Sequence, residues 1–525
     1  MGTDNDGNDL GSTGLGSTGL GSTGLGGTGL GGTGLGGTVT AGDRTMAPPG
    51  DPARQNETPR VPLLSAKALA TSMVAGAGIN LALRQYPNSI AATVAIALVA
   101  GVLLFSGMLE SRASKVLVGL APVFGLWLAI RASAPVIAFD IIAIVGLFGL
   151  GVALSKRGRF FDYRFSWLLQ SGAYFIEDGI MAGPYATKSV VELSAGQNRE
   201  TVRQSITGLA IATPILLVVG ILLAQADNEF ASIFSWLGTT GIFGHVALIA
   251  IGVLIVVMLL RAAQADRTDF EIPGTGILAP TTSLVIVLGF VGLYGLFVGT
   301  QIVDILNTTF SHEEIRDFAR SGFFQLLWVS VITLATLMLV PAITKEANPV
   351  THRRLRNASA LAIGLTMIIT AMSVRRLLLF IEIDELTMLR TFALIGAATI
   401  GLIFILLAAK LWGWNSDRDW FVGATISVLL LVVFGLNVAN PEAIVARYNT
   451  GATDKIESID MRYLGQLSAD ATPTLVDALD SLPDAEAAEL TNSLCQRWRF
   501  ADDRDGLGYN RATVNAESLI AQLCP

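Results

Sequence analysis

The sequence has few of the residues that catalysis and metal binding use. Its 525 residues include three histidines and two cysteines, and their spacing matches no metalloenzyme pattern. Charged residues make up 15%, against about 25% in soluble proteins. Hydrophobic residues make up 52%, and the mean hydropathy is +0.58. This composition disfavours a soluble enzyme, a nucleic-acid-binding protein and a coiled coil, and it indicates an integral membrane protein without metal or cofactor.

Residues 1–60 differ in composition from the rest of the chain. Leucine recurs at every fifth position from Leu10 to Leu35 within a Gly/Thr/Ser tract. A period of five fits neither a helix nor a strand, and the glycine content gives the backbone great freedom. We therefore expect a disordered tail, with a tether for a partner as the alternative.

Apolar windows long enough to cross a bilayer recur from Val61 onward. Backbone amides in lipid must be satisfied within their own segment, and the windows lack the alternation of a membrane β-barrel, so they predict helices. The fold class is an all-α polytopic transmembrane bundle over residues 61–438, with about eleven spans. The expected spans are 62–82, 88–108, 114–131, 134–154, 205–225, 243–260, 281–304, 323–343, 358–378, 391–411 and 420–438.

The distribution of basic residues predicts the orientation in the membrane. With eleven spans, the loops on the N-terminal side hold twenty Lys and Arg, and the loops on the opposite side hold seven. Because basic residues are retained on the cytoplasmic side, we expect a cytoplasmic N-terminus and an extracytoplasmic C-terminus at the plasma membrane.

The C-terminal unit (residues 439–525) is acidic and has helical signals. From Asn437 to Pro525 the chain has seven basic and fourteen acidic residues, which accounts for the whole net charge of −7. Both cysteines, Cys495 and Cys524, lie here. An extracytoplasmic unit favours a disulfide between them, whereas a cytosolic tail would hold two free thiols. We expect this small helical subdomain to dock on the span ends, and its acidic face offers a surface for an envelope protein partner.

The long loop from residue 155 to residue 204 begins with basic residues and continues with aromatic ones, from Phe160 to Phe175. This composition is typical of a helix in the headgroup layer, so anchoring to the lipid bilayer is the favoured role. Lipid binding or substrate gating is the alternative.

Ionisable residues within the spans are candidate functional groups because burying charge in lipid is costly. Asp140, early in the fourth span, is either a proton or cation ligand of a transporter or a residue close enough to the interface to be hydrated. Arg375 and Arg376 end the apolar part of the ninth span, where long side chains reach headgroups more readily than they form an anion site. Pro122 and Pro214 predict kinked helices, which are common in membranes and also line transporter sites.

Five stretches carry a resemblance to a known family. They are ADNEFASIF (Ala226–Phe234), IRDFARSGFFQLLWV (Ile315–Val329), SVRRLLLFIE (Ser373–Glu382), NPEAIVARYN (Asn440–Asn449) and IDMRYLGQLSADATPTL (Ile459–Leu475), with a weaker one at GYNRATVNA (Gly508–Ala516). Together they resemble bacterial polytopic membrane proteins of the DUF4153 and DUF4173 type, domains of unknown function.

The resemblance implies a multi-pass membrane protein and supplies no activity. It places these residues at positions of the family pattern: Arg320, Phe323, Asn440, Pro441, Arg447, Asn449, Asp460 and Tyr463. Asn440 and Pro441 are expected to end the last span, and Arg447 and Asn449 to hydrogen-bond the turn that directs the C-terminal unit.

Three functions remain open. The first is a non-enzymatic envelope protein whose C-terminal unit senses a ligand or binds a partner. The second is a secondary transporter that uses Asp140 and kinked spans. The third is a membrane-embedded enzyme acting on lipid-linked substrates, which lacks a recognisable acid, base or nucleophile.

Overall fold

The computed structural model describes the chain in segments. They are residues 61–156, 160–161, 165–193, 201, 204, 242–265, 277–307, 323–345, 348–383, 385–413, 419–451, 459–498 and 506–524. The chain divides into two units, Met1–Thr58 and Pro59–Pro525. The glycine-rich tail and the window 205–225, with its Pro214, lie outside the described residues.

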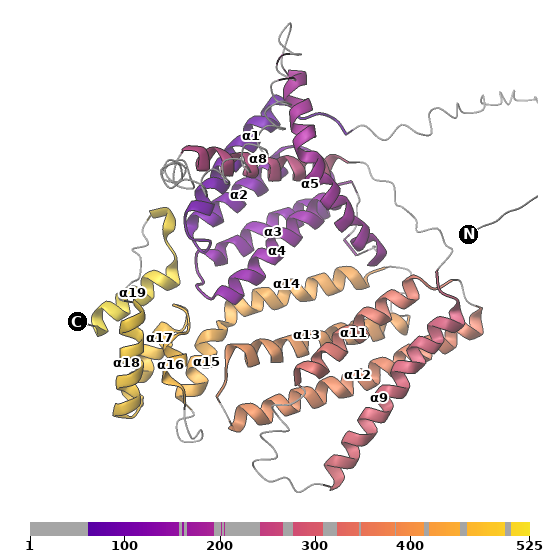
Figure 1. Cartoon of the computed structure of the whole chain (residues 1–525). Coiled ribbons are helices and arrows are strands. Elements are labelled where there is room, and N and C mark those ends of the chain that lie inside the picture. Colours follow the sequence, from indigo (N-terminus) through magenta and orange to yellow (C-terminus); the bar gives the residue numbers. More distant parts are fainter. Residues whose placement is uncertain are drawn as a thin grey trace, which may run out of the picture. The chain divides into compact units, whose positions relative to one another are not determined.

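A first group of helices packs around one buried apolar cluster. Its members are α1 (Ala66–Arg84), α2 (Ile90–Phe105), α3 (Arg112–Leu128), α4 (Ala134–Ala153), α5 (Phe165–Leu193) and α8 (Ile242–Gln264). Helix α1 packs against α8, and α3 against α4 (Figure 1). Ser65, Ser89 and Ser111 each cap a helix by accepting a backbone N–H, which defines where α1, α2 and α3 begin.

The first crossing is unusually close because it is formed by glycines. Atoms of Gly76 on α1 lie 2.9–3.0 Å from the position that a Cβ on Gly252 of α8 would take. Small residues at this crossing let two membrane helices approach through their backbones, so packing replaces the missing hydrophobic driving force.

A second group of helices contains the later spans. It comprises α9 (Pro280–Asn307), α11 (Phe323–Ala342), α12 (Pro349–Ile383), α13 (Met388–Leu411) and α14 (Phe421–Ala439). Helix α12 packs against α9, α11 and α13, and α14 contacts both α13 and α4 (Figure 1). Contact between α14 and α4 therefore joins the two groups.

The C-terminal unit is helical. It contains α15 (Pro441–Thr450), α16 (Met461–Gly465), α17 (Thr472–Ala478), α18 (Asp484–Trp498) and α19 (Arg511–Leu523), with short turns η2 (Leu479–Ser481) and η3 (Gly506–Gly508). Its apolar core includes residues of α12 and α13 and of the segment between them: Leu377, Ile381, Leu386 and Ala393. The unit is therefore packed onto the ends of the spans.

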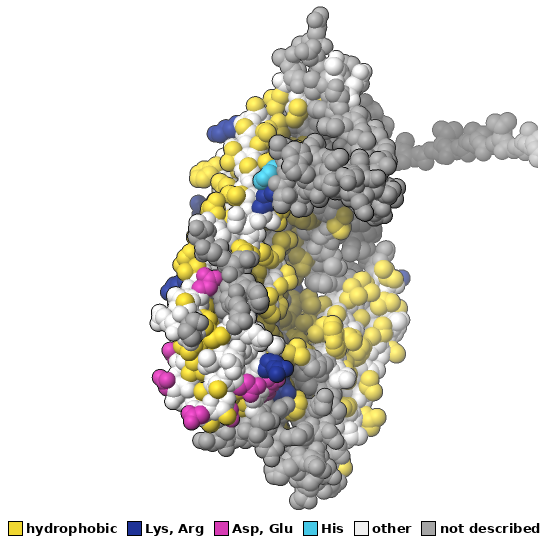
Figure 2. Space-filling view, turned by 60° about the vertical axis from the view of Figure 1, so that its left-hand side comes forward, with side chains coloured by type: hydrophobic (Ala, Val, Ile, Leu, Met, Phe, Trp, Pro, Cys, Tyr) yellow, Lys and Arg dark blue, Asp and Glu magenta, His cyan; other side chains and the backbone are white. Residues whose placement is uncertain are grey.

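The helices confirm an all-α membrane bundle. Seven are long and apolar enough to cross a membrane, and α2 and α11 contain shorter apolar segments. Every expected span within the described residues coincides with a helix, although α3 is not among the seven. Hydrophobic side chains cover much of the described surface in Figure 2, as lipid contact requires, and the acidic ones gather in its lower part.

Candidate functional site

Asp140 lies inside α4 and is completely buried by the protein. Its exposed fraction is 0%. Asn437, in the last turn of α14, donates a hydrogen bond from Nδ2 to Asp140 Oδ1 over 2.7 Å. Asp140 Oδ2 and Asn437 Oδ1 have no hydrogen-bond partner in the described part of the chain. The structure therefore buries this carboxyl within the protein and pairs it with an amide.

Arg131 connects this pair to the C-terminal unit. Its Nε donates to the backbone oxygen of Asn437 over 2.8 Å, and a terminal nitrogen donates to the same oxygen. Its other terminal nitrogen forms an ion pair with Asp470 over 3.4 Å. The guanidinium carbon lies 5.7 Å from the ring centroid of Trp127, within cation–π range. We call Arg131, Asp140, Asn437 and Asp470 the polar hub.

Asp470 caps a helix that is distant in sequence. Ser133 occupies the N-cap of α4, but its side chain makes no capping bond. Instead, Asp470 Oδ2 accepts from the backbone N–H groups of Ala132 and Ser133 over 2.7 and 2.8 Å. A carboxylate at a helix N-terminus is favourable because free N–H groups and the helix dipole both attract negative charge.

Asn440 joins α14 to α15 in a left-handed conformation, with φ 52° and ψ 77°. Asparagine tolerates this region better than most residues. Its Oδ1 caps α15 by accepting from Ala443, and its Nδ2 donates to the backbone oxygen of Asp470 over 3.0 Å. Pro441 follows as the first residue of α15, where its missing N–H costs nothing.

Glu442 is a buried carboxyl just outside the last span. Its Oε2 accepts from the backbone N–H of Ser468 over 2.6 Å. Burial raises the pKa of Glu442 above its ordinary value of 4.5, with a further increase from the charge of Asp470 and an opposing effect of the bonds to Ser468. The exposed fraction of Glu442 is 5%, so its carboxyl contributes to the docking of the C-terminal unit and not to the outer surface.

Asn510 attaches α19 to the ends of α2 and α3. Its Nδ2 lies within hydrogen-bond distance of three backbone oxygens, those of Asn88, Leu128 and Arg131, at 3.1, 3.0 and 2.9 Å. Its Oδ1 accepts from Thr513 over 3.1 Å and so caps α19. One buried side chain therefore starts a helix of the C-terminal unit and holds the turns that precede and follow two helices of the bundle.

A second set of contacts holds the turn between α12 and α13. Asn449 pairs with Leu386 through both the backbone N–H and the backbone oxygen, each over 2.9 Å. Tyr463 Oη accepts from the N–H of Met388 over 2.8 Å, and burial raises the pKa of this phenol. Asp460 caps α16 by accepting from Tyr463 N–H over 2.9 Å. These family-pattern residues contact backbone and are placed for architecture.

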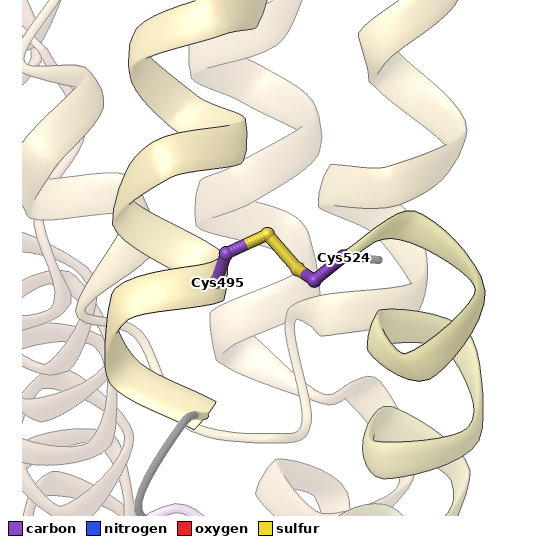
Figure 3. Close-up of a disulfide and its surroundings, with 2 residues drawn as sticks. All are labelled: Cys495 and Cys524. Carbon is purple, nitrogen blue, oxygen red and sulfur yellow. A yellow bond between two sulfur atoms is a disulfide. The ribbon is translucent and has the colours of Figure 1, made fainter.

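Cys495 and Cys524 form a disulfide in the structure (Figure 3). Cys495 belongs to α18 and Cys524 directly follows α19, with their Cα atoms 5.8 Å apart. The bond therefore ties the last helix to the preceding one, and α19 in turn carries the cap residue Asn510.

The remaining candidate residues lie apart from the polar hub. Arg375 and Arg447 are exposed, and Arg376 donates to Gln301 of α9. Phe323 begins α11, but its side chain is outside the described part, and so is all of Arg320. The described residues contain no group of His, Cys, Asp and Glu placed to hold a metal ion.

Sequence reasoning missed most of the polar hub. Arg131 entered it only as one of the seven basic residues in the loops opposite the N-terminal side, and Asp470 only as a member of the resembling stretch Ile459–Leu475. Asn437 had a usable signal, because a lone amide in the apolar run FGLNVA resembles a partner for a buried polar group. The stretches that contain Asp470 and Asn510 gave no signal of the partners of these residues, which lie more than 300 residues away in the sequence.

Comparison with known proteins places the chain in a family. A search of curated proteins and a search of solved structures both found no match. A family model described as a domain of unknown function, DUF4153, matches residues 72–478. The matched part covers every residue of the polar hub and ends before Asn510 and both cysteines. Since it spans more than half of the chain, this multi-pass membrane protein belongs to the DUF4153 family.

Proposed function

We propose that the protein is a non-enzymatic envelope protein whose C-terminal unit binds a partner or senses a ligand outside the cytoplasm. In this proposal the spans anchor the unit and receive the event that it detects. The observation that carries the proposal is the capping of α4 by Asp470, because this contact couples the C-terminal unit to the interior of the bundle.

The coupling follows from the shared bonds of the polar hub. Asp470 pairs with Arg131, Arg131 holds the backbone oxygen of Asn437, and the side chain of Asn437 binds Asp140. If a ligand moved the segment that contains Asp470, Arg131 would lose its buried ionic partner and α4 its cap. Leaving a buried charge unpaired is costly, so such a movement cannot remain local.

Two observations support an extracytoplasmic position of the unit. The loops of the two faces differ in basic residues by twenty to seven, as expected when the first face is cytoplasmic. The disulfide between Cys495 and Cys524 is of a kind that persists in oxidising compartments.

Labelling with a thiol reagent that does not cross membranes tests this orientation. After mild reduction of intact cells, Cys495 and Cys524 are expected to react. In a C495S/C524S background, Lys156→Cys places a single thiol in the loop predicted to be cytoplasmic, and it should react only after the membrane is opened. Labelling of Lys156→Cys alone in intact cells would contradict the orientation.

Four exposed acidic residues between the start of α17 and the middle of α18 are the proposed contact surface for a partner of positive charge. They are Asp477, Asp480, Asp484 and Glu489. A photo-crosslinking residue at Asp480 should give an adduct in intact cells, and the D484K variant should reduce its yield by more than half. The matched control, Gln522→Lys at an exposed position of α19, should leave the yield unchanged. Equal yields in all backgrounds, or no adduct, would contradict binding through this face.

A secondary transporter is the second candidate, and the buried Asp140 is the observation that favours it. An ionisable group inside a span often belongs to a substrate or ion pathway. Loss of uptake or efflux in a folded D140N variant would favour transport, whereas unchanged transport profiles would favour the first proposal.

A further inference from the structure

The contacts of Asp140 are too few for an ionised carboxylate. A carboxylate has about four acceptor positions, and the described residues supply one donor, Asn437 Nδ2. Asp140 Oδ2 is left without a partner while the side chain is fully buried. An ionised group in this environment lacks both water and compensating hydrogen bonds, which is the least stable arrangement for a charge.

The nearby positive charge of Arg131 is already paired with another carboxylate, Asp470. The terminal nitrogens of Arg131 reach Asp470 and the backbone oxygen of Asn437, and no ion pair between Arg131 and Asp140 exists among the described residues. The charge of Arg131 is therefore balanced by Asp470, and a negative charge on Asp140 would be one in excess.

The helices around α4 supply no other counter-ion for Asp140. Helix α14 has no ionisable residue, and the basic residues of α3, Arg112 and Lys115, lie in its first turn, at the opposite end of α3 from the connection to α4. On α8, His245 bonds Asn80 and Arg261 pairs with Asp178 of α5. The other ionisable residues of α5 are Tyr174, Glu177, Tyr185, Lys188 and Glu192. On this count Asp140 faces only the amide of Asn437 and the neutralised Arg131.

One added proton would give both unpartnered atoms of this pair a hydrogen bond. We propose that Asp140 and Asn437 form a proton-binding site inside the membrane bundle. Protonation converts the carboxylate to a carboxylic acid, which gains an O–H donor and loses its charge, and no co-reactant is needed. The acceptor for such a donor is present on the same partner, since Asn437 Oδ1 is also unpartnered. The site binds a proton whether the protein senses or transports.

The position of the site allows exchange from one side. Asp140 is the seventh residue of α4, so it lies about 9 Å along the helix from its capped end at the polar hub. The other end of α4, at Ala153, is about 20 Å away. We therefore expect proton exchange to take place on the side of the C-terminal unit.

Infrared spectroscopy of the purified full-length protein in lipid nanodiscs tests the proposal. Difference spectra between pH steps report the C=O stretch of carboxylic acids. Wild type is expected to show a band from Asp140 that persists at neutral pH, where exposed carboxyls are ionised, and E442Q removes any band of the buried Glu442. The band should disappear in D140N and move in frequency in D140E, and the exposed control D480N should keep it. N437L removes the donor to the ionised form, so its band should persist to still higher pH.

Two results would overturn the proposal. One is the absence at neutral pH of any carboxylic-acid band that D140N removes, which would mean that Asp140 is ionised. The other is a band that vanishes when sodium replaces choline at constant pH, which would make the pair a cation site instead. If D140N does not fold, the frequency shift in D140E carries the same decision, because a band that does not move cannot belong to residue 140.

Discussion

At the scale of single residues, a few polar side chains hold together segments that are distant in the sequence. Asp470 binds the two backbone N–H groups directly before α4, and it balances the charge of Arg131 at the same time. Asn437, Asn440, Asn449 and Asn510 each bind backbone or side-chain groups of other segments. Asparagine suits this role because its amide donates and accepts without carrying charge.

Replacing Asp470 with alanine should destabilise the folded protein by about 3–5 kcal/mol, the usual cost of removing one partner of a buried ion pair. Arg131 would keep its bonds to Asn437 but lose its counter-ion, and two N–H groups at the start of α4 would lose their acceptor. The measurement is the apparent Tm in detergent. D480A removes an exposed carboxyl and should have little effect; equal losses in both variants would argue against the capping role.

Glu442 should make stability depend on pH. Its pKa is raised in the folded state, so the folded protein binds more protons than the unfolded chain above pH 4.5. The stabilisation is complete below the unfolded value and is lost as the pH rises through the folded value. Unfolding measured from pH 4.5 to neutrality should show wild type losing more stability than E442Q, which keeps an acceptor for Ser468. Parallel curves would contradict the assignment.

The limits of sequence reasoning are clear at this scale. Asp140 was found because a carboxyl inside an apolar run is costly wherever it points. Its partner Asn437 was not, because an uncharged amide near a span end has an ordinary explanation. Predicting the role of Asp470 would require knowing which backbone segment it binds. A contact across more than 300 residues leaves no pattern along the chain.

At the scale of elements, the crossing of α1 and α8 depends on the lack of a side chain. A Cβ at Gly76 would lie 2.8 Å from the backbone oxygen of Ile249 and 2.7 Å from a methyl group of Val253. G76A should therefore separate the helices and cost about 1–3 kcal/mol, as overpacking does. Thermal unfolding checks this. At Gly101 of α2 a Cβ would meet nothing within 4 Å, so G101A should be neutral or slightly stabilising.

Variants at Asn510 separate its two roles at the start of α19. N510A removes the helix cap and the donor to three carbonyl oxygens, whereas N510D keeps a cap acceptor but places a carboxylate beside those oxygens. If the donor role dominates, stability follows the order wild type, N510A, N510D. If the cap dominates, N510D resembles wild type and N510A loses about 1 kcal/mol. Hydrogen exchange of α19 distinguishes the two orders, and we expect the first.

Elements were the most predictable level. Apolar length alone located the expected spans, since each one within the described residues coincides with a helix, whereas α5, which packs against α8, lies in the segment expected as a loop in the headgroup layer. The structure adds that α12 runs for 35 residues, about 52 Å, which exceeds the hydrocarbon thickness. The sequence pattern showed only its apolar centre, 358–378. Charged turns that continue a helix beyond the membrane do not differ in composition from a loop.

At the scale of the whole molecule, the disulfide fastens the end of the chain. The two cysteines are 29 residues apart, so the chain-entropy model assigns the bond about 3.6 kcal/mol. C495S/C524S should show faster hydrogen exchange in α18 and α19 and a lower apparent Tm. Adding a reductant to wild type should reproduce these changes and leave the variant unaffected. A reductant effect on the variant would mean that another group is responsible.

The arrangement of the molecule was only partly predictable. Hydropathy and charge predicted a bundle followed by an acidic helical unit, and the family match agrees with a polytopic protein. The contacts between the unit and the bundle could not be predicted, because they depend on turns at span ends that carry no periodic pattern. The orientation in the membrane is still an inference from loop charge and the disulfide.

Asn437 binds Arg131 and Asp140 with different atoms. Its backbone oxygen receives Arg131, and its amide reaches Asp140. Every amino acid retains that oxygen, so mutagenesis at codon 437 can alter the carboxyl's environment without deleting the guanidinium's anchor. Conversely, substitutions at Arg131 leave the amide in place. The two contacts of Asn437 can thus be changed independently, and an epistasis measurement between the codons for 131 and 437 would reveal whether the environment of Asp140 is coupled to the C-terminal unit.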